Sequence, residues 1–405
     1  MSTRTSDPQE VGREVLGPIV AEFCLRLWSL GAAFERPGEA AFLFCARGGL
    51  RMQLAYERFL AASALPSAVH VAPLMVSRVV AMRPALSRTA EEGLDHLLPA
   101  AARTLGHEFG QASVAEVARA MSGAVPLGDD LQWQRPLTSD GLARLLRHAD
   151  GEPVSEALRS QSALFGRHLQ ESLDGRRQAV LVDTGLHGTT ALVLAEGLPQ
   201  VSVSSALMAN YFPPTRNERP PRTFGLTLEA DGYSPLRPRS VLLRYWHLVE
   251  WLFEPALESV RWFEETDGVV RSNLEVPGWQ EKVPPEAGSA FAGVLSYLDA
   301  LPPAPAEKVV LDAETAWDRL HRAVVFPRAG DALALAVSDR THDFGRDTTF
   351  STRPWQGPVA ALRGAAMWRE GEIARSGTAF RVPLLALVQA AYGARRVKRA
   401  LIRGS

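Results

Sequence analysis

Residues 180–190 read Val-Leu-Val-Asp-Thr-Gly-Leu-His-Gly-Thr-Thr. The apolar run 179–182 predicts a buried strand that ends at Asp183, and the Gly and Thr residues after it predict a short loop that opens a helix over 190–196. A strand, a glycine loop and a helix in this order are typical of an α/β protein, in which ligands sit beyond the carboxyl ends of the strands. The stretch therefore indicates both a fold class and a place for a site.

The same alternation of strand and helix continues on both sides of this stretch. Residues 40–45 and 69–76 are almost wholly apolar, which suits strands of a parallel sheet that helices cover on both faces. Residues 201–208 supply a fourth strand, and residues 11–30 show apolar side chains at helical spacing before a glycine stop signal. The sequence thus predicts an α/β fold with a doubly wound parallel sheet.

The length of 405 residues is enough for two or three folding units. We expect residues 1–86 and 176–240 to form the two parts of one α/β domain, which ends in an irregular loop or linker over the Pro- and Arg-rich residues 213–238. Residues 87–175 have helical periodicity and almost no strand signal, which predicts a helical insertion. Residues 241–405 predict a mainly helical C-terminal region.

The composition, with 46% hydrophobic and 22% charged residues, is that of an ordinary globular protein. The 44 Lys and Arg residues nearly balance the 45 Asp and Glu residues, so the net charge of -1 gives no reason to expect a nucleic-acid partner. Cys24 and Cys45 lie in apolar runs, where a buried thiol acts as a small hydrophobe. Their spacing suggests neither a zinc site nor a disulfide framework.

The cellular location is predicted from the apolar and basic segments. Residues 1–12 lack the apolar region of a secretory signal, and no later apolar run reaches the ~20 residues that span a membrane, so we expect a cytoplasmic protein. Residues 395–403 are basic, with apolar side chains interleaved. This tail is either a solvated terminal helix or a peripheral contact with an anionic membrane surface.

The first candidate site is the loop at 183–190. Its glycines let backbone amides approach an anion closely, its threonine hydroxyls donate hydrogen bonds, and the helix N-terminus adds partial positive charge. Asp183 can accept hydrogen bonds from ribose hydroxyls or hold a divalent metal through water. The alternative is that Asp183 is only a helix N-cap before a turn of small residues. The candidate phosphate-binding residues of this loop are Asp183, Thr184, Gly185, Leu186, His187, Gly188, Thr189 and Thr190.

The second candidate site is the turn Ala46, Arg47, Gly48 and Gly49, which follows the strand at 40–45. The glycine pair exposes backbone amides, and the guanidinium of Arg47 can clamp a pyrophosphate through two hydrogen bonds. The alternative is a surface turn with a solvated arginine. A donor with phosphate at one end and pyrophosphate at the other needs two such loops at adjacent strand ends.

Other single residues are weaker candidates. Ser77 and Arg78 follow the strand at 69–76 and can reach a diphosphate, although a solvated or ion-paired arginine is as common. Glu250 and Glu254 lie four residues apart in an aromatic stretch, where mutual repulsion would raise the pKa of a general base. The alternative for this pair is a helix edge in water. His187 either contacts phosphate or has no function.

The turn at 46–49 and the loop at 183–190 together resemble the pyrophosphate loop and the ribose-phosphate loop of type I phosphoribosyltransferases. More specifically, four pieces between residues 17 and 254 resemble bacterial polysaccharide-cluster proteins often labelled HAD-associated, whose non-phosphatase part is a glycosyl phosphoribosyltransferase. The pieces are Gly17-Pro18 with the helix leading to Phe44-Cys-Ala-Arg-Gly-Gly49, then Val76-Ser-Arg78, Val182-Asp-Thr-Gly-Leu-His-Gly-Thr189 and, more loosely, Leu248-Val-Glu-Trp-Leu-Phe-Glu254.

The resemblance implies a glycosyltransferase that moves 5-phosphoribosyl from phosphoribosyl diphosphate (PRPP) to a sugar hydroxyl of a lipid-linked bacterial surface polysaccharide and releases pyrophosphate. It also implies Mg²⁺, for which Asp183 is the candidate ligand, and a separate HAD-type phosphatase that acts on the product. Asp183 and Glu250 are the candidate catalytic residues.

Two departures from the family pattern leave other functions open. Val182 precedes Asp183, where the usual ribose-phosphate motif has a second acidic residue, and Gly48 stands where many polysaccharide-cluster relatives have Asp. Both departures favour a regulator that binds ribose phosphate or nucleotide without transferring it. A nucleobase phosphoribosyltransferase is a further alternative, but the insertion and the C-terminal region exceed what base salvage needs. The acceptor sugar and the oligomeric state stay open.

Overall fold

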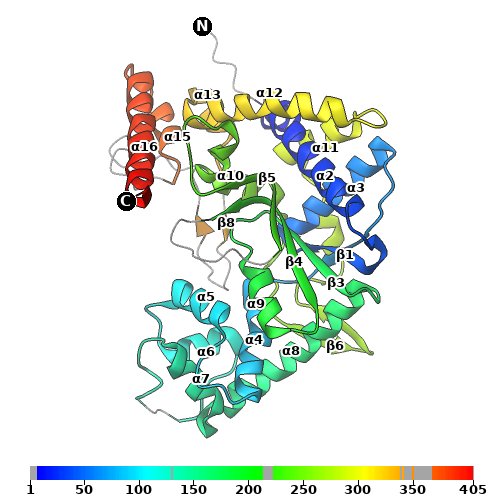
Figure 1. The fold of residues 1–405 in the computed structure, drawn as a ribbon, viewed down its shortest axis with the longest axis vertical. Coiled ribbons are helices and arrows are strands. Elements are labelled where there is room, and N and C mark those ends of the chain that lie inside the picture. Colours follow the sequence, from blue (N-terminus) through cyan, green and yellow to red (C-terminus); the bar gives the residue numbers. More distant parts are fainter. Residues whose placement is uncertain are drawn as a thin grey trace.

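The computed structural model describes residues 7–128, 131–212, 222–337 and 367–404, together with two short strands, β8 (Arg340–Thr341) and β9 (Thr349–Phe350). A five-stranded parallel sheet in the order β2-β1-β3-β4-β5 runs through the middle of the molecule (Figure 1). Its strands are β1 (Ala40–Cys45), β2 (His70–Leu74), β3 (Gln178–Asp183), β4 (Ser202–Tyr211) and β5 (Thr223–Ala230).

The inner strand β1 is buried along its whole length, because it pairs with β2 on one side and β3 on the other while helices cover both faces. Side chains alternate between the two faces of a strand. Phe42 and Phe44 therefore pack into the larger core, whereas Ala41, Leu43 and Cys45 pack into the smaller core on the opposite face. The continuous apolar run of β1 reflects this burial on both sides.

Helices from distant parts of the chain cover the two faces of the sheet. One face packs against α2 (Gly17–Ala32), α3 (Gly48–Ser63), α11 (Ala290–Asp299) and α12 (Ala306–Val325). The other face packs against α4 (Arg78–Glu91), α8 (Glu152–Leu173), α9 (Thr189–Gly197) and the hairpin of β6 (Phe263–Thr266) and β7 (Val269–Ser272). The predicted α/β class with helices on both faces is confirmed.

The residues between β2 and β3 add a helical layer with a core of its own. It contains α5 (Pro99–Phe109), α6 (Val114–Ser122) and α7 (Ser139–Arg147), which pack against α4 and α8 through side chains such as Leu105 and Met121. Figure 1 shows these helices gathered at one end of the molecule. The described residues of this segment add no strand to the sheet, as the sequence predicts for 87–175.

The remaining described elements precede β1 or follow β5, except for η3, which lies between α7 and α8. They are α1 (Pro8–Val11), the helical turns η1 (Gly12–Leu16), η2 (Pro37–Glu39), η3 (Ala149–Gly151), η4 (Pro238–Leu243) and η5 (Trp279–Lys282), and the helices α10 (Trp246–Phe253), α13 (Ala329–Ala334), α15 (Arg369–Arg375) and α16 (Arg381–Gly404).

One prediction about the later part of the chain is wrong, and the prediction of a mainly helical C-terminal region is confirmed with one β-hairpin added. The segment 213–238 is not only an irregular linker, because its described part contains β5, an edge strand in which Phe224, Leu226 and Leu228 alternate with polar residues or glycine. Because prolines and arginines lie before and after this strand, its alternation of apolar and polar residues is difficult to recognise in the sequence. The C-terminal region also contains the β6–β7 hairpin, whose Asp267-Gly268 turn has positive φ at both residues, 53° and 78°. An Asp-Gly pair is a strong hairpin signal.

The continuous helix Pro8–Ala32 is long and apolar enough to cross a membrane by length and composition. That property alone is weak evidence, since buried core helices share it, and 61% of the apolar window is buried here. The helix packs on α11 and α12, and a side chain at Gly12 would collide with the carbonyl oxygen of Ala290. We therefore interpret it as a core helix. The cytoplasmic location stays a prediction.

Candidate functional site

The two candidate loops lie at the point where the strand order of the sheet reverses. The chain passes from β1 to its neighbour β2 and later returns to β3 on the other side of β1. In open parallel sheets, ligands bind at the carboxyl ends of the two strands that flank such a switch point. The turn at 46–49 follows β1 directly, and the loop at 184–188 follows β3 directly. The topology thus places both loops beside one crevice.

Close contacts show that the loops touch. A Cβ atom built on Gly48 would lie 3.6 Å from Cγ2 of Thr184 and 3.8 Å from Cβ of Phe253. Burial, and next the negative charge of nearby Asp183, raise the pKa of the Cys45 thiol. Residues from the ends of β1 and β3 and from the end of α10 therefore surround the same small volume.

Helix α10 touches both loops with its two ends. Its last residue, Phe253, contacts Gly48, and its first residue, Trp246, would lie 3.4 Å from a Cβ atom on Gly185. Eight helical residues span about 12 Å. The aromatic helix α10, which follows the sheet in the sequence, thus lines one side of the crevice. The spacing of its residues gives no indication of this position.

The loop after β3 is anchored through its carbonyl groups. The backbone amide of Ala209 donates to the carbonyl oxygen of Thr184 (3.2 Å), and the amide of Tyr211 donates to that of Leu186 (2.9 Å). In the part of the chain that the structure describes, the amides of Gly185 and Gly188 donate to no protein acceptor. The loop therefore turns its carbonyl oxygens toward β4 and keeps backbone N–H groups available for an anion.

Glycine is required at both of those loop positions. Gly185 has φ of +132°, and a side chain there would collide with the carbonyl oxygen of Ala209. Gly188 has φ of +61° and is the N-cap of α9, which has no side-chain cap. Asp183 is therefore not the N-cap of this helix, and that alternative is wrong. Its Oδ1 accepts instead from the amide of Thr184 at 2.7 Å.

The turn after β1 has the same form. Helix α3 begins at Gly48, its N-cap is Arg47, and no side chain caps it. The added Cβ at Gly49 would lie 2.6 Å from the carbonyl carbon of Phe44, so this position also requires glycine. The peptide bonds Ala46–Arg47 and Gly185–Leu186 are both cis. Two helix N-termini without side-chain caps therefore meet at the crevice, each with partial positive charge.

Arg47 is neither solvated nor directed at open space. Its guanidinium forms an ion pair with Glu254, and Nη1 donates to the carbonyl oxygen of Leu257 at 2.9 Å. The side chains of Arg47 and Glu254 are only 10% and 15% exposed. One turn further along α3, Arg51 donates to the carbonyl oxygen of Glu254 at 3.2 Å. Two arginines thus hold the segment after α10 against the end of β1.

The predicted relation between Glu250 and Glu254 is wrong. Glu254 lies beyond the end of α10 with extended backbone angles (φ -82°, ψ 111°), so the two carboxylates do not share a helical face. Glu250 lies 3.4 Å from Nδ1 of His247, while Glu254 pairs with Arg47. The structure therefore brings Glu254 into the candidate site, where the sequence pattern had favoured Glu250.

Ser77 and Arg78 have structural partners. The hydroxyl of Ser77 donates to the carbonyl oxygen of Val260 (2.6 Å) and accepts from the amide of Val80 (3.3 Å), which makes it the N-cap of α4. Arg78 forms an ion pair with Glu108 at 3.4 Å. The ion-paired alternative for Arg78 is therefore confirmed, and contact of either residue with a diphosphate stays a prediction.

His187 lies at the exposed rim of the loop. Its Nδ1 is 3.3 Å from the carbonyl oxygen of Tyr211, and the two rings lie 5.5 Å apart at an angle of 51°. On the neighbouring position of β4, Asn210 is fully buried, and neither polar atom of its amide has a hydrogen-bond partner among the described residues. Buried polar groups without partners are uncommon and often mark functional sites. Its only sequence signal is a polar residue in an otherwise apolar run.

The described residues contain no group of three or more His, Cys, Asp or Glu side chains that could hold a metal by themselves. This does not exclude Mg²⁺, because proteins usually bind it through one or two carboxylates together with substrate phosphates. Asp183 at the end of β3 is a carboxylate of this kind. The prediction that it binds Mg²⁺ remains untested.

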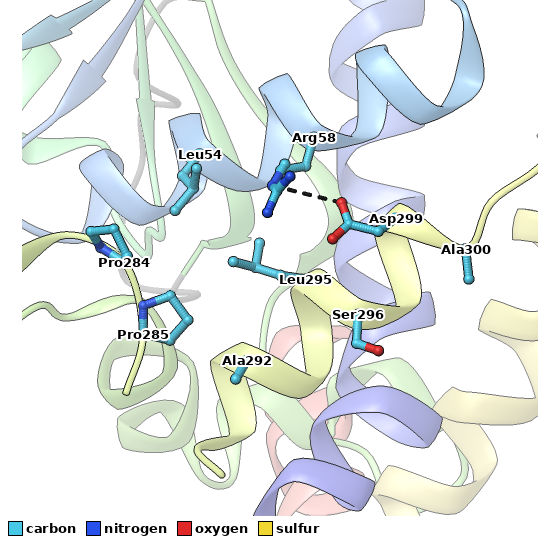
Figure 2. Close-up of a pocket in the computed structure, with 9 residues that line it drawn as sticks. All are labelled: Leu54, Arg58, Pro284, Pro285, Ala292, Leu295, Ser296, Asp299 and Ala300. Carbon is cyan, nitrogen blue, oxygen red and sulfur yellow. Dashed lines mark ion pairs between the residues drawn. The ribbon is translucent and has the colours of Figure 1, made fainter. Parts of the chain in front are cut away.

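A separate groove of about 620 Å³ lies between α3 and α11 (Figure 2). Leu54, Leu295 and two prolines supply most of its apolar lining, and Arg58 pairs with Asp299 at 3.6 Å on one side. Figure 2 shows that Leu54 and Arg58 come from α3, whereas Leu295 and Asp299 come from α11. None of the lining residues belongs to the turn at 46–49 or to the loop at 183–190. The groove therefore does not belong to the crevice between the two loops.

Comparisons with known proteins add no family. No protein-family model matches the chain. No curated protein matches it in sequence either. The resemblance to phosphoribosyltransferases therefore rests on the quoted motifs alone.

Proposed function

We propose that the chain binds PRPP in the crevice between the turn at 46–49 and the loop at 183–190 and transfers 5-phosphoribosyl to a saccharide hydroxyl. The observation that carries this proposal is the contact between the two loops, with only 3.6 Å between an added Cβ on Gly48 and Thr184. A compact donor with two anionic ends can engage two anion-binding loops that border one crevice.

Electrostatics and backbone geometry support an anionic ligand in the crevice. The N-termini of α3 and α9 both lack side-chain caps, and each presents N–H groups and partial positive charge. Helix N-termini are common binding sites for phosphate. The strand order also suits the phosphoribosyltransferase-like fold that the motifs imply, with the diphosphate end at α3 and the 5-phosphate end at α9.

The ion pair between Arg47 and Glu254 bears on how the diphosphate would be held. Arg47 already satisfies its charge with a carboxylate, so a diphosphate must compete with Glu254 for the guanidinium. Displacement of Glu254 would leave a carboxylate beside the donor. We therefore add Glu254 to Asp183 and Glu250 as a candidate for the general base.

The proposed reaction forms a bond between C1 of the ribose and the acceptor oxygen and breaks the bond between C1 and the pyrophosphate oxygen. A carboxylate takes the proton of the acceptor hydroxyl, and pyrophosphate leaves with the bonding electron pair. The backbone amides at the starts of α3 and α9 hold the two phosphate ends and keep the donor in place. Mg²⁺ bound by Asp183 and donor oxygens would neutralise the charge of the leaving group. Inversion at C1 would give a β-linked ribofuranose 5-phosphate, the substrate of a separate HAD-type phosphatase.

A direct experiment tests this function. Purified protein is titrated with PRPP in the presence of Mg²⁺, and pyrophosphate release is then measured with candidate polysaccharide acceptors. Ribose 5-phosphate and pyrophosphate are titrated separately as controls, because each of them can fill only one end of the crevice. We expect PRPP to bind more tightly than either fragment, because it engages both loops. Equal affinity for PRPP and for one fragment would contradict a site with two loops.

A regulator that binds the donor without transferring it is the second candidate. The closed pair of Arg47 and Glu254 favours it, as does the single acidic residue Asp183 after Val182. Binding of PRPP that depends on both loops, without release of pyrophosphate from PRPP to either a saccharide acceptor or water, would identify this function.

A further inference from the structure

Among the residues that the structure describes, helix α16 contacts the body of the protein along one face. Leu385 and Val388 are buried against Ile373 of α15, and Gln389 accepts a hydrogen bond from the hydroxyl of Tyr233 at 2.7 Å. Nearer the C-terminal end, Arg396 pairs with Asp231 at 3.0 Å. Figure 1 shows α16 at the edge of the molecule beyond α15. These contacts fix which face of the helix turns outward.

The outward face of α16 is apolar. At 3.6 residues per turn, most of its exposed apolar residues fall within a sector of about 140° that points away from Leu385 and Val388. The four largest side chains in this sector are 57% to 70% exposed. We call this surface the outer face; its residues are Val382, Ala386, Leu387, Ala390, Ala394, Val397 and Leu401.

The same helix concentrates positive charge. It contains six basic residues and no acidic residue, and five of the six lie within residues 395–403. Because the whole chain has a net charge of -1, the rest of it carries -1 - 6 = -7. An otherwise acidic protein thus presents one helix that is basic at its end and apolar along its exposed side. This combination is typical of helices that lie in the plane of a membrane interface.

We propose that the outer face of α16 docks onto an anionic membrane surface. The apolar residues would enter the boundary between headgroups and acyl chains, while the exposed side chains of Arg395 and Lys398 contact anionic headgroups. A second copy of the chain is a poorer partner for this face. Two outer faces brought together would align positive charges without any acidic residue on α16 to compensate them. This inference does not depend on the proposed donor site.

Sedimentation with lipid vesicles tests the proposal on the full chain. The vesicles contain either phosphatidylcholine alone or a mixture with phosphatidylglycerol, and the salt concentration is varied. We expect binding only to the anionic vesicles, and we expect it to weaken as salt rises. The double variant V397E/L401E should bind the anionic vesicles at least tenfold more weakly. Its melting temperature should stay parental, because both side chains are at least 60% exposed.

A matched control separates the outer face from net charge. The double variant V310E/L311E changes the same two residue types on α12, where the side chains are 47% and 56% exposed. It should bind vesicles like the parent. The proposal would be overturned if V397E/L401E bound the anionic vesicles as tightly as the parent. It would also be overturned if V397E/L401E and V310E/L311E lost vesicle binding to the same extent. A parental dimer that V397E/L401E converts to monomers would also overturn it and assign the face to a second copy. PRPP binding, measured in parallel, should be unchanged in every variant.

Discussion

The substitution Gly48→Ala places one methyl group between the two candidate loops. Its Cβ would lie 3.6 Å from Thr184 and 3.8 Å from Phe253, which are ordinary van der Waals distances, so the protein needs no rearrangement to accept it. Gly48 is the first residue of α3, where Ala leaves the free energy of unfolding unchanged or raises it by up to about 1 kcal/mol. We therefore expect a melting temperature at or slightly above the parental value.

The same methyl group should weaken binding of the donor. It occupies the approach to the backbone amides of Gly48 and Gly49, which the proposal assigns to the diphosphate. A hydrogen bond from an amide to a charged oxygen contributes about 1.5–3 kcal/mol. Loss of one such bond would raise the Kd for PRPP roughly 10- to 150-fold.

Isothermal titration with PRPP and Mg²⁺ measures this change, and the shift in melting temperature caused by the donor gives an independent readout. The matched control is Gly166→Ala in the middle of α8, where the added Cβ has no atom within 4 Å. This control should be about 0.5–1 kcal/mol more stable and should bind PRPP like the parent. A parental Kd for Gly48→Ala would refute the assignment of the diphosphate to this turn.

Four further substitutions test other parts of the argument. Asp183→Asn keeps the shape of the side chain but removes its charge, so we expect a parental melting temperature and much slower pyrophosphate release; equal release would remove Asp183 from the site. Glu254→Gln removes the charge that competes for Arg47, so the Kd for PRPP should fall, and a higher Kd would contradict competition. Gly188→Ala forces a side chain to φ of +61°, and urea unfolding should show a loss of about 1 kcal/mol, whereas parental stability would argue against the left-handed conformation. Burial lowers the pKa of His168, and its neutral Nε2 accepts a hydrogen bond from the amide of Met75 (3.0 Å). The neutral imidazole therefore stabilises the folded state above about pH 6.5, and this stabilisation is lost as the pH falls through the lower pKa that His168 has in the folded protein. His168→Gln should therefore flatten the dependence of the melting temperature on pH below 6.5, and an unchanged slope would refute this role.

Most of the sheet could be predicted because its inner strands are buried on both faces. Strand β1 runs over Ala40–Cys45, the same residues as the predicted apolar run, and β3 extends the predicted run by one residue at each end. A wholly apolar run before a glycine turn leaves few alternatives. The edge strand β5 escaped prediction because only part of it is buried, so its apolar residues alternate with polar ones between proline-rich segments.

The sequence by itself determined the two loops and the residue types in them. Glycines at 48, 49, 185 and 188 and a helix start after each loop follow from short-range patterns, because turn geometry and helix starts depend on neighbouring residues. Only the tertiary structure decided what those loops meet. Arg47 pairs with Glu254, and Gly48 lies beside Thr184, across separations of more than a hundred residues. Such contacts arise from the order of strands and the return of α10 past the end of β1, and no local pattern of residues encodes that path.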